Sequence, residues 1–286
     1  MISIIDEKAY AKLNISLDVA DKRDDGYHNM VMVMQSISLC DDIHIELNAS
    51  GRVSARSNFR FIPDDERNLA VKAAKIFFAK RGDAKTGAVI SIKKHIPVGS
   101  GMGGGSADAA AVLRALNRAF DRPYSPEELA AIGAEVGSDV PFCVIGGTAF
   151  VRGRGEIVTP LPPFPKCKFV VCKPSFSVST PELFKKLDKI QNRRHPDTAG
   201  IIEALKVNEL DKISRRMYNV FEEVNDRRFR RVSEIKSVLL DHGALGAVMT
   251  GTGSAVFGVF DSASKAENAC AALKKERIFC CIADCV

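Results

Sequence analysis

A glycine-rich segment between an apolar strand and an alanine-rich helix most constrains the fold of this chain. Glycines at positions 101, 103, 104 and 105 follow the strand-like run 88–96 and precede a helix that the sequence predicts over 106–120. Glycine lets the backbone adopt positive φ and approach a ligand closely. The free amides and the positive end of the following helix would converge on an anion, most naturally the phosphates of a nucleotide. The segment therefore predicts a strand–loop–helix unit with a phosphate site.

This loop matches neither the lysine-containing P-loop pattern nor the strand-initial glycine fingerprint of dinucleotide-binding folds. Since the loop has no lysine of its own, a positive charge must come from elsewhere in the chain. Lys12 and Lys94 are the candidates.

A proline-rich stretch divides the chain into two parts. Residues 159–165 contain four prolines in seven positions, which excludes a regular helix or a central strand there. A length of 286 residues is enough for about two domains. We expect one domain over 1–158 and a second over 159–286.

Hydrophobic periodicity predicts mixed α+β structure in both parts. Residues 9–19 alternate with period two, which indicates a half-buried strand with Lys12 and Asn14 side by side on its polar face. The first part adds strands over 31–39, 42–47 and 88–96, helices over 69–80 and 106–120, and a hairpin over 147–157. The second part has the order β-α-β-β-α-β of a ferredoxin-like fold, with a helical first crossover over 180–224. Its predicted strands are 168–173, 246–249, 254–260 and 278–283.

Charge and cysteine content narrow the class of protein. The net charge of +6 is too small and too dispersed to imply a nucleic-acid partner, and the basic run 227–231 is typical of a solvated helix face. Eight cysteines without a Cys-x-x-Cys pair argue against a zinc site and favour a reducing compartment. No apolar run approaches a membrane span, and the acidic pair Asp6-Glu7 interrupts any signal-like segment. We expect a cytoplasmic protein without nucleic-acid or membrane partners.

Two shorter motifs are open to more than one interpretation. Asp139 begins a short apolar turn, with Ser138 placed to cap it, and could be either a functional carboxylate or a plain N-terminal helix charge. Residues 250–255 (TGTGSA) lie between two predicted strands and, taken alone, indicate a tight hairpin.

Taken together, the motifs resemble those of the GHMP small-molecule kinases, a family that includes the homoserine and mevalonate kinases. Residues 9–14 (AYAKLN), 97–110 and 249–257 look like the three motifs of that family and follow in the same order. Within it, the chain is most similar to the branch that acts on a cytidine-diphosphate-linked methylerythritol in non-mevalonate isoprenoid synthesis. That narrower resemblance depends on residues 22–28 (KRDDGYH), the triple glycine and residues 137–142 (GSDVPF).

The resemblance implies a fold, cofactors and a reaction. The first domain would be like the second domain of ribosomal protein S5, and the second domain would be ferredoxin-like. ATP with Mg²⁺ would phosphorylate the 2-hydroxyl of the substrate, and the protein would be a monomer or a homodimer. The implied ATP-binding residues are Lys94, Pro97, Val98, Gly99, Ser100, Gly101, Met102, Gly103, Gly104, Gly105, Ser106 and Ala107. The magnesium ligands are not identified.

By the same resemblance, Asp139 would be the catalytic carboxylate and Lys12 its partner. A tertiary alcohol is a poor nucleophile, so a nearby carboxylate can accept its proton while a lysine keeps that carboxylate ionised. The implied substrate-binding residues are Asn14, Tyr27, His28, Thr180 and Phe184. Tyr27 would stack on cytosine and His28 would satisfy its polar edge, whereas Phe184 would close the other face or belong to the core.

Two alternatives stay open at this point. Another GHMP kinase, of the homoserine or mevalonate type, is disfavoured by the segment 25–28 (DGYH), since those relatives have no cytosine to hold. A non-enzymatic RNA-binding or ligand-sensing protein on the same scaffold is disfavoured because it would need neither Lys12 nor Asp139.

Overall fold

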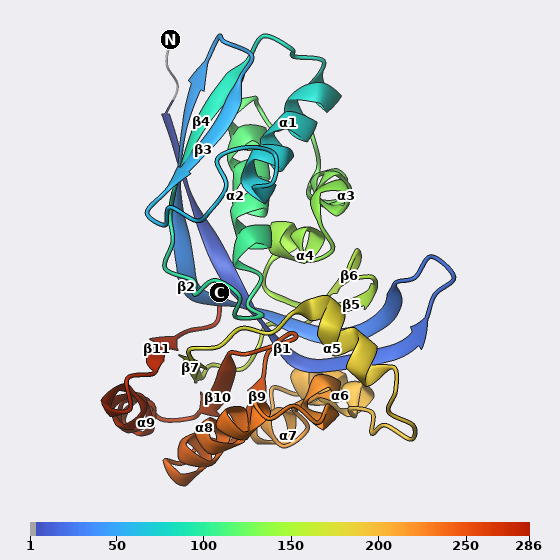
Figure 1. Ribbon diagram of the computed structural model, residues 1–286, viewed down its shortest axis with the longest axis vertical. Helices are drawn as coiled ribbons and strands as arrows, with labels where there is room; N and C mark the ends of the chain where they lie inside the picture. The colour runs from blue at the N-terminus through green and yellow to red at the C-terminus, as the bar shows by residue number, and fades with distance from the viewer. Residues whose placement is uncertain (1–3) are drawn as a thin grey trace.

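The computed structural model describes residues 4–286, and over these residues the chain forms one seven-stranded and one four-stranded sheet (Figure 1). Helices α1 to α4 cover one side of the large sheet, and the C-terminal helices gather around the small one. Within the same residues, no helix is long and apolar enough to cross a bilayer.

Two long antiparallel strands form the central part of the large sheet. They are β1 (Ile4–Lys22) and β2 (His28–Asn48), and the sheet order is β3-β4-β2-β1-β8, with β5 pairing to β2 and to β6. The remaining strands of the first part are β3 (Val53–Ser57), β4 (Gly87–Lys93), β5 (Thr148–Gly153) and β6 (Ile157–Pro160). Its helices are α1 (Leu69–Arg81), α2 (Gly104–Ala119), α3 (Pro126–Val136) and α4 (Val140–Ile145).

The prediction that the first strand is half-buried is wrong. Every residue from 11 to 19 is buried, including Lys12, Asn14 and Ser16. The polar face of β1 is covered because it meets two loops: the Lys12 amide donates to Met102 O over 3.1 Å, and the Asn14 amide donates to Thr250 Oγ1 over 3.1 Å. The alternation of β1 therefore separates an apolar core from a polar seam, and not a core from solvent.

The structure also differs from the predicted strands near β1. The predicted strands 31–39 and 42–47 are one continuous strand, β2, whose first part pairs with β5 and whose last part pairs with β4. Strand β3 was not predicted; it pairs in parallel with β4 at the edge of the sheet.

The small sheet confirms the β-α-β-β-α-β prediction. It contains β7 (Lys168–Lys173), β9 (Gly246–Met249), β10 (Val256–Phe260) and β11 (Phe279–Ala283) in the order β11-β7-β10-β9, with antiparallel neighbours. Helices α8 (Phe229–Asp241) and α9 (Ala263–Lys275) pack against it.

The crossover that follows β7 is divided into more and shorter elements than the helical segment that the sequence predicts. Between residues 180 and 224 lie α5 (Thr180–Leu187), α6 (Thr198–Lys206), α7 (Leu210–Ser214), the two-residue strand β8 (Tyr218–Asn219) and a short 3₁₀ helix, Val220–Glu223. Strand β8 pairs in parallel with β1, so a segment from the second half of the chain completes the large sheet.

The Asn219 side chain links β8 to the β9–β10 hairpin by hydrogen bonds, and its replacement should destabilise the fold. Its buried amide donates to Met249 O over 2.7 Å and to Gly251 O over 2.8 Å, while its Oδ1 accepts from the Phe221 amide. Asn219→Leu would leave these buried groups unpaired, at about 1–3 kcal/mol each, so we expect the free energy of unfolding to fall by about 3 kcal/mol. Urea denaturation followed by circular dichroism measures this. A loss no larger than that of the exposed control Asn225→Leu would contradict the assignment.

Candidate active site

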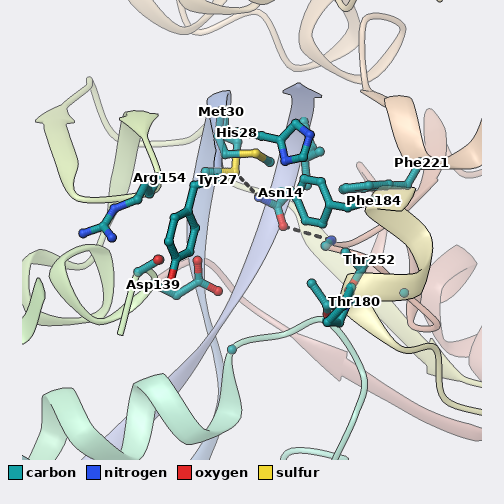
Figure 2. A pocket seen from close by; sticks show the side chains of 18 of the residues that line it. Asn14, Tyr27, His28, Met30, Asp139, Arg154, Thr180, Phe184, Phe221 and Thr252 are labelled. Carbon is teal, nitrogen blue, oxygen red and sulfur yellow. Dashed lines mark hydrogen bonds between the residues drawn. The ribbon is translucent and has the colours of Figure 1, made fainter. Parts of the chain in front are cut away.

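A cavity of about 760 Å³ lies where β1, the glycine-rich loop, α5 and the β9–β10 hairpin meet (Figure 2). It is bordered by Lys12 and Asn14 from β1, by Asp139 before α4, and by Thr180 and Phe184 from α5. The motifs that lie far apart in the sequence are therefore brought to one place.

Lys12 and Asp139 form the charged centre of this cavity. The Lys12 side chain is 4% exposed, and its Nζ lies 2.7 Å from Asn14 Oδ1 and 3.7 Å from Asp139 Oδ2. Asp139 occupies the N-cap position of α4 but makes no side-chain capping hydrogen bond, and its carboxylate is 33% exposed. The predicted capping by Ser138 is wrong, because the helix begins one residue later than expected. Asp139 is thus a partly solvated carboxylate beside a buried ammonium.

The Asn14 side chain forms hydrogen bonds with other groups of the protein. Its Oδ1 accepts hydrogen bonds from Lys12 Nζ, from Thr250 Oγ1 over 3.2 Å and from the Gly251 amide over 3.0 Å. Its Nδ2 lies 3.3 Å from the Met32 sulfur, and the side chain is fully buried. Asn14 therefore holds Lys12 against the β9–β10 hairpin, which is a role that the sequence did not indicate.

The glycine-rich loop has the geometry that a phosphate site requires. Gly99, Gly101 and Gly103 have φ of +64°, +82° and +68°. Gly103 is the N-cap of α2, and no side chain among residues 4–286 caps this helix, so its first amides can bind an anion. A Cβ on Gly103 would lie 3.1 Å from Lys12 Cγ and 3.8 Å from Asp139 Oδ2, so the loop packs directly against the charged pair. The site fits the phosphates of a nucleotide.

A second cavity, of about 360 Å³, continues along the other side of the loop. It shares Leu69, Ser106 and three glycines, 99, 101 and 103, with the larger cavity. Asn68 borders it, but Asn68 Oδ1 also caps α1 by accepting from the Ala70 amide. Lys12 and Asp139 border the larger cavity only, but Gly103, which both cavities share, packs against this pair. This arrangement suits a phosphate donor in one cavity and an acceptor in the other.

The structure separates the predicted nucleotide residues into two groups. Those bordering the second cavity are Lys94, Pro97, Val98, Gly99, Ser100, Gly101, Gly103, Gly104, Gly105 and Ser106. Met102 and Ala107 border neither cavity, and their side chains are buried in the core. The Lys94 ammonium is not free, because it forms ion pairs with Asp41 and Asp108.

Aromatic side chains line part of the larger cavity. Tyr27, in the loop between β1 and β2, is 54% exposed; its ring points toward Asp139, and the Arg154 guanidinium lies 4.9 Å from the ring centroid (Figure 2). His28 stacks on Phe184 with a centroid distance of 4.7 Å, and Phe184 meets Phe221 edge-on at 4.9 Å. Phe184 thus combines the two predicted roles: it is half-buried and it borders the cavity.

Other polar residues of the cavity have partners within the protein. The His28 ring hydrogen-bonds Asp188 through Nε2 at 2.8 Å, and Thr180 Oγ1 lies 2.9 Å from Thr252 Oγ1. Sequence reasoning missed Asp188 and Phe221, because nothing local marks them. Thr252 was not named as a site residue, although it lies in the segment 250–255 that the sequence analysis interprets as a tight hairpin. Arg154 could have been found from its motif, residues 153–156 (GRGE), where one charged residue lies between turn-forming glycines.

Comparisons with known proteins agree with this geometry. The family model of the GHMP kinases N terminal domain matches residues 68–147, and that of the GHMP kinases C terminal domain matches residues 201–278. The 4-diphosphocytidyl-2-C-methyl-D-erythritol kinase of Clostridium perfringens (strain SM101 / Type A) is 45% identical over 93% of this chain and 92% of its own length. The same-named kinase of Listeria monocytogenes serotype 4a (strain HCC23) is 45% identical over 91% and 88%.

Solved structures extend the comparison to the fold. A crystal structure of 4-(cytidine 5'-diphospho)-2C-methyl-D-erythritol kinase matches with a TM-score of 0.80 and 31% identity, covering 98% of this chain and 99% of the other. Homoserine kinase from Cytophaga hutchinsonii also gives a TM-score of 0.80, but at 20% identity over 99% and 94% of the chains, so that likeness shows the fold alone. From the two family models and the long matches at 45% identity, the chain belongs to the GHMP kinase family.

Proposed function

We propose that this kinase transfers the γ-phosphoryl group of ATP to the 2-hydroxyl of 4-diphosphocytidyl-2-C-methyl-D-erythritol, giving the 2-phosphate and ADP in non-mevalonate isoprenoid synthesis. The observation that carries the proposal is the Lys12–Asp139 pair, which borders the aromatic-walled cavity and packs against Gly103, a glycine that this cavity shares with the cavity along the phosphate loop. The names of the 45% identical relatives support the same substrate.

The chain's own residues account for the chemistry. The amides at the start of α2 and the loop glycines hold the ATP phosphates, and Asp139 accepts the proton of the attacking hydroxyl. Lys12, whose Nζ lies 3.7 Å from Asp139 Oδ2, offsets charge on the phosphoryl group in a loose transition state. Asn14 keeps Lys12 in position.

Magnesium enters the proposal with the nucleotide. Within residues 4–286, no cluster of three or more potential metal ligands occurs, and the protein ligands of Mg²⁺ are not assigned. In kinase sites Mg²⁺ is usually bound by substrate phosphates, several waters and one or two carboxylates, and it neutralises charge on the nucleotide. The cytoplasmic location, the monomer or homodimer, and the absence of nucleic-acid and membrane partners stay predictions from the sequence.

An acceptor comparison tests the proposed substrate. We expect kcat/KM for the cytidine-linked substrate to exceed that for mevalonate or homoserine by at least ~10³-fold, because those acceptors lack the base and the diphosphate that fill the larger cavity. Coupled detection of ADP measures the three acceptors under the same conditions. Comparable turnover of mevalonate or homoserine would assign the chain to another branch of the family, and binding of single-stranded RNA without any turnover would favour the non-enzymatic alternative.

Replacement of the proposed base tests the mechanism. Asp139→Asn keeps the size of the side chain but cannot take the proton, so kcat should fall at least ~10²-fold while ATP still binds. Single-turnover kinetics separate chemistry from product release. The exposed carboxylate Asp261, paired with Lys265, provides the matched control Asp261→Asn. An Asp139→Asn enzyme retaining more than about a third of the wild-type rate, with chemistry rate-limiting, would exclude Asp139 as the base.

Tyr27 tests the pyrimidine site. Base–aromatic stacking is worth ~1–3 kcal/mol by alanine substitution, so Tyr27→Ala should raise KM for the cytidine substrate roughly ten- to hundredfold. The ATP KM should change little, because Tyr27 does not border the second cavity. Steady-state kinetics with each substrate varied in turn measure both values, with Phe279→Ala, an exposed aromatic on β11, as the control. An equal rise in both KM values would remove Tyr27 from the base site.

A further inference from the structure

Behind the phosphate loop, two carboxylates share one ammonium group. Lys94 Nζ forms ion pairs with Asp41 of β2 and with Asp108 of α2, the latter at 2.6 Å. The three side chains, Lys94, Asp41 and Asp108, are 3%, 0% and 6% exposed. Such burial is costly for charges unless each is compensated.

The cluster contacts both ends of the loop. Asp41 Oδ1 accepts hydrogen bonds from the amides of His95 and Ile96, at 2.5 and 2.8 Å, just before the loop begins. Asp108 lies on α2 just after the loop, and a Cβ on Gly104 would be 3.3 Å from Lys94 Nζ. Asp41 and Asp108 are therefore positioning residues for the segment that faces the nucleotide.

The charges of the cluster do not balance if both carboxylates are ionised. Two negative groups and one positive group would leave a net negative charge beside a site for a polyanion. Asp108 Oδ1 is also buried without a hydrogen-bond partner within residues 4–286, which an ionised carboxylate tolerates poorly. Burial, followed by the charge of nearby Asp41, raises the pKa of Asp108 to about 8, although Lys94 opposes this.

We propose that Asp41, Lys94 and Asp108 hold one shared proton beneath the phosphate loop, and that this proton keeps the nucleotide site free of a net negative charge. The inference rests on the proposed use of ATP. Lys94 then contributes to nucleotide binding indirectly: it is the counter-ion of the two positioning carboxylates and does not itself bind a phosphate.

The sign of the pH effect follows from the surroundings of Asp108. Lys94 and Asp41 are its charged neighbours, and from α4 the Cys143 thiol faces the same region with a pKa that burial raises to about 12, so it stays neutral. At pH 7 the cluster holds its proton, and above about pH 8 the free protein loses it. A bound polyanion favours the protonated form, so nucleotide binding at pH 9 should take up a proton.

Calorimetry with a non-hydrolysable ATP analogue and Mg²⁺, in buffers of different ionisation enthalpy, tests the proposal. The wild-type protein should take up close to one proton at pH 9 and close to none at pH 7. If the deprotonated form binds poorly, affinity should fall by about 30-fold between pH 7 and pH 9.5. Asp108→Asn carries a permanently neutral group, so it should show no proton uptake and little pH dependence. Asp42→Asn is the matched control, since Asp42 follows Asp41 but its carboxylate pairs with the exposed side chains of Lys8 and His95 and not with Lys94.

The outcomes are separable. Tight binding by the wild type at pH 9 without proton uptake, or an unchanged pH dependence in Asp108→Asn, would overturn the shared proton and leave the proposed function intact. No binding of the analogue at any pH would overturn both. Should Asp108→Asn fail to fold, carboxyl-carbon NMR of the wild-type protein decides the point: one aspartate titrating near pH 8 supports the proposal, and titration of all aspartates below pH 6 contradicts it.

Discussion

The buried oxygen of Asn14 is the interaction on which the rest of the site depends. One acceptor atom receives donors from Lys12 on its own strand and from Thr250 and Gly251 on the β9–β10 hairpin. A buried amide that lost these donors would be destabilising, so these hydrogen bonds favour the observed arrangement of the two sheets. That arrangement sets Lys12 beside Asp139 and brings the hairpin against the phosphate loop, where Gly101 approaches Thr250 too closely for any side chain.

Two buried lysines, Lys12 and Lys94, lie on either side of the phosphate loop, and they have different roles because their neighbours differ. Lys12 lies near a single, partly exposed carboxylate and an amide, so its positive charge still acts in the cavity. Lys94 is neutralised by two buried carboxylates, so it stabilises the loop from behind. Both lysines were candidates for the phosphate charge from the sequence alone. Spacing could not separate them, because Asp41 is 53 residues from Lys94 and only the fold brings the two together.

Local patterns predicted what short-range forces determine. The strand over residues 9–19, the helix after the glycine-rich loop and the β-α-β-β-α-β succession of elements in the second part were confirmed, since each element is marked by a hydrophobic period and by turn chemistry within a few residues. What failed depended on distant partners: β8 has two residues and exists through pairing with β1, the polar face of β1 is covered by loops more than 80 residues away, and His28 finds Asp188 across 160 residues. The roles of Lys12, Asp139 and Tyr27 came from family resemblance, and the structure adds that they border one cavity.

The most direct test is a crystal structure of the protein with the cytidine-linked substrate and a non-hydrolysable ATP analogue. The account predicts that the 2-hydroxyl oxygen lies within about 2.6–3.2 Å of the Asp139 carboxylate. It also predicts the base against Tyr27 and the triphosphate at the start of α2. A 2-hydroxyl more than about 5 Å from Asp139 in a fully occupied ternary complex, beyond hydrogen-bond reach, or a cytidine group bound in the smaller cavity, would contradict it.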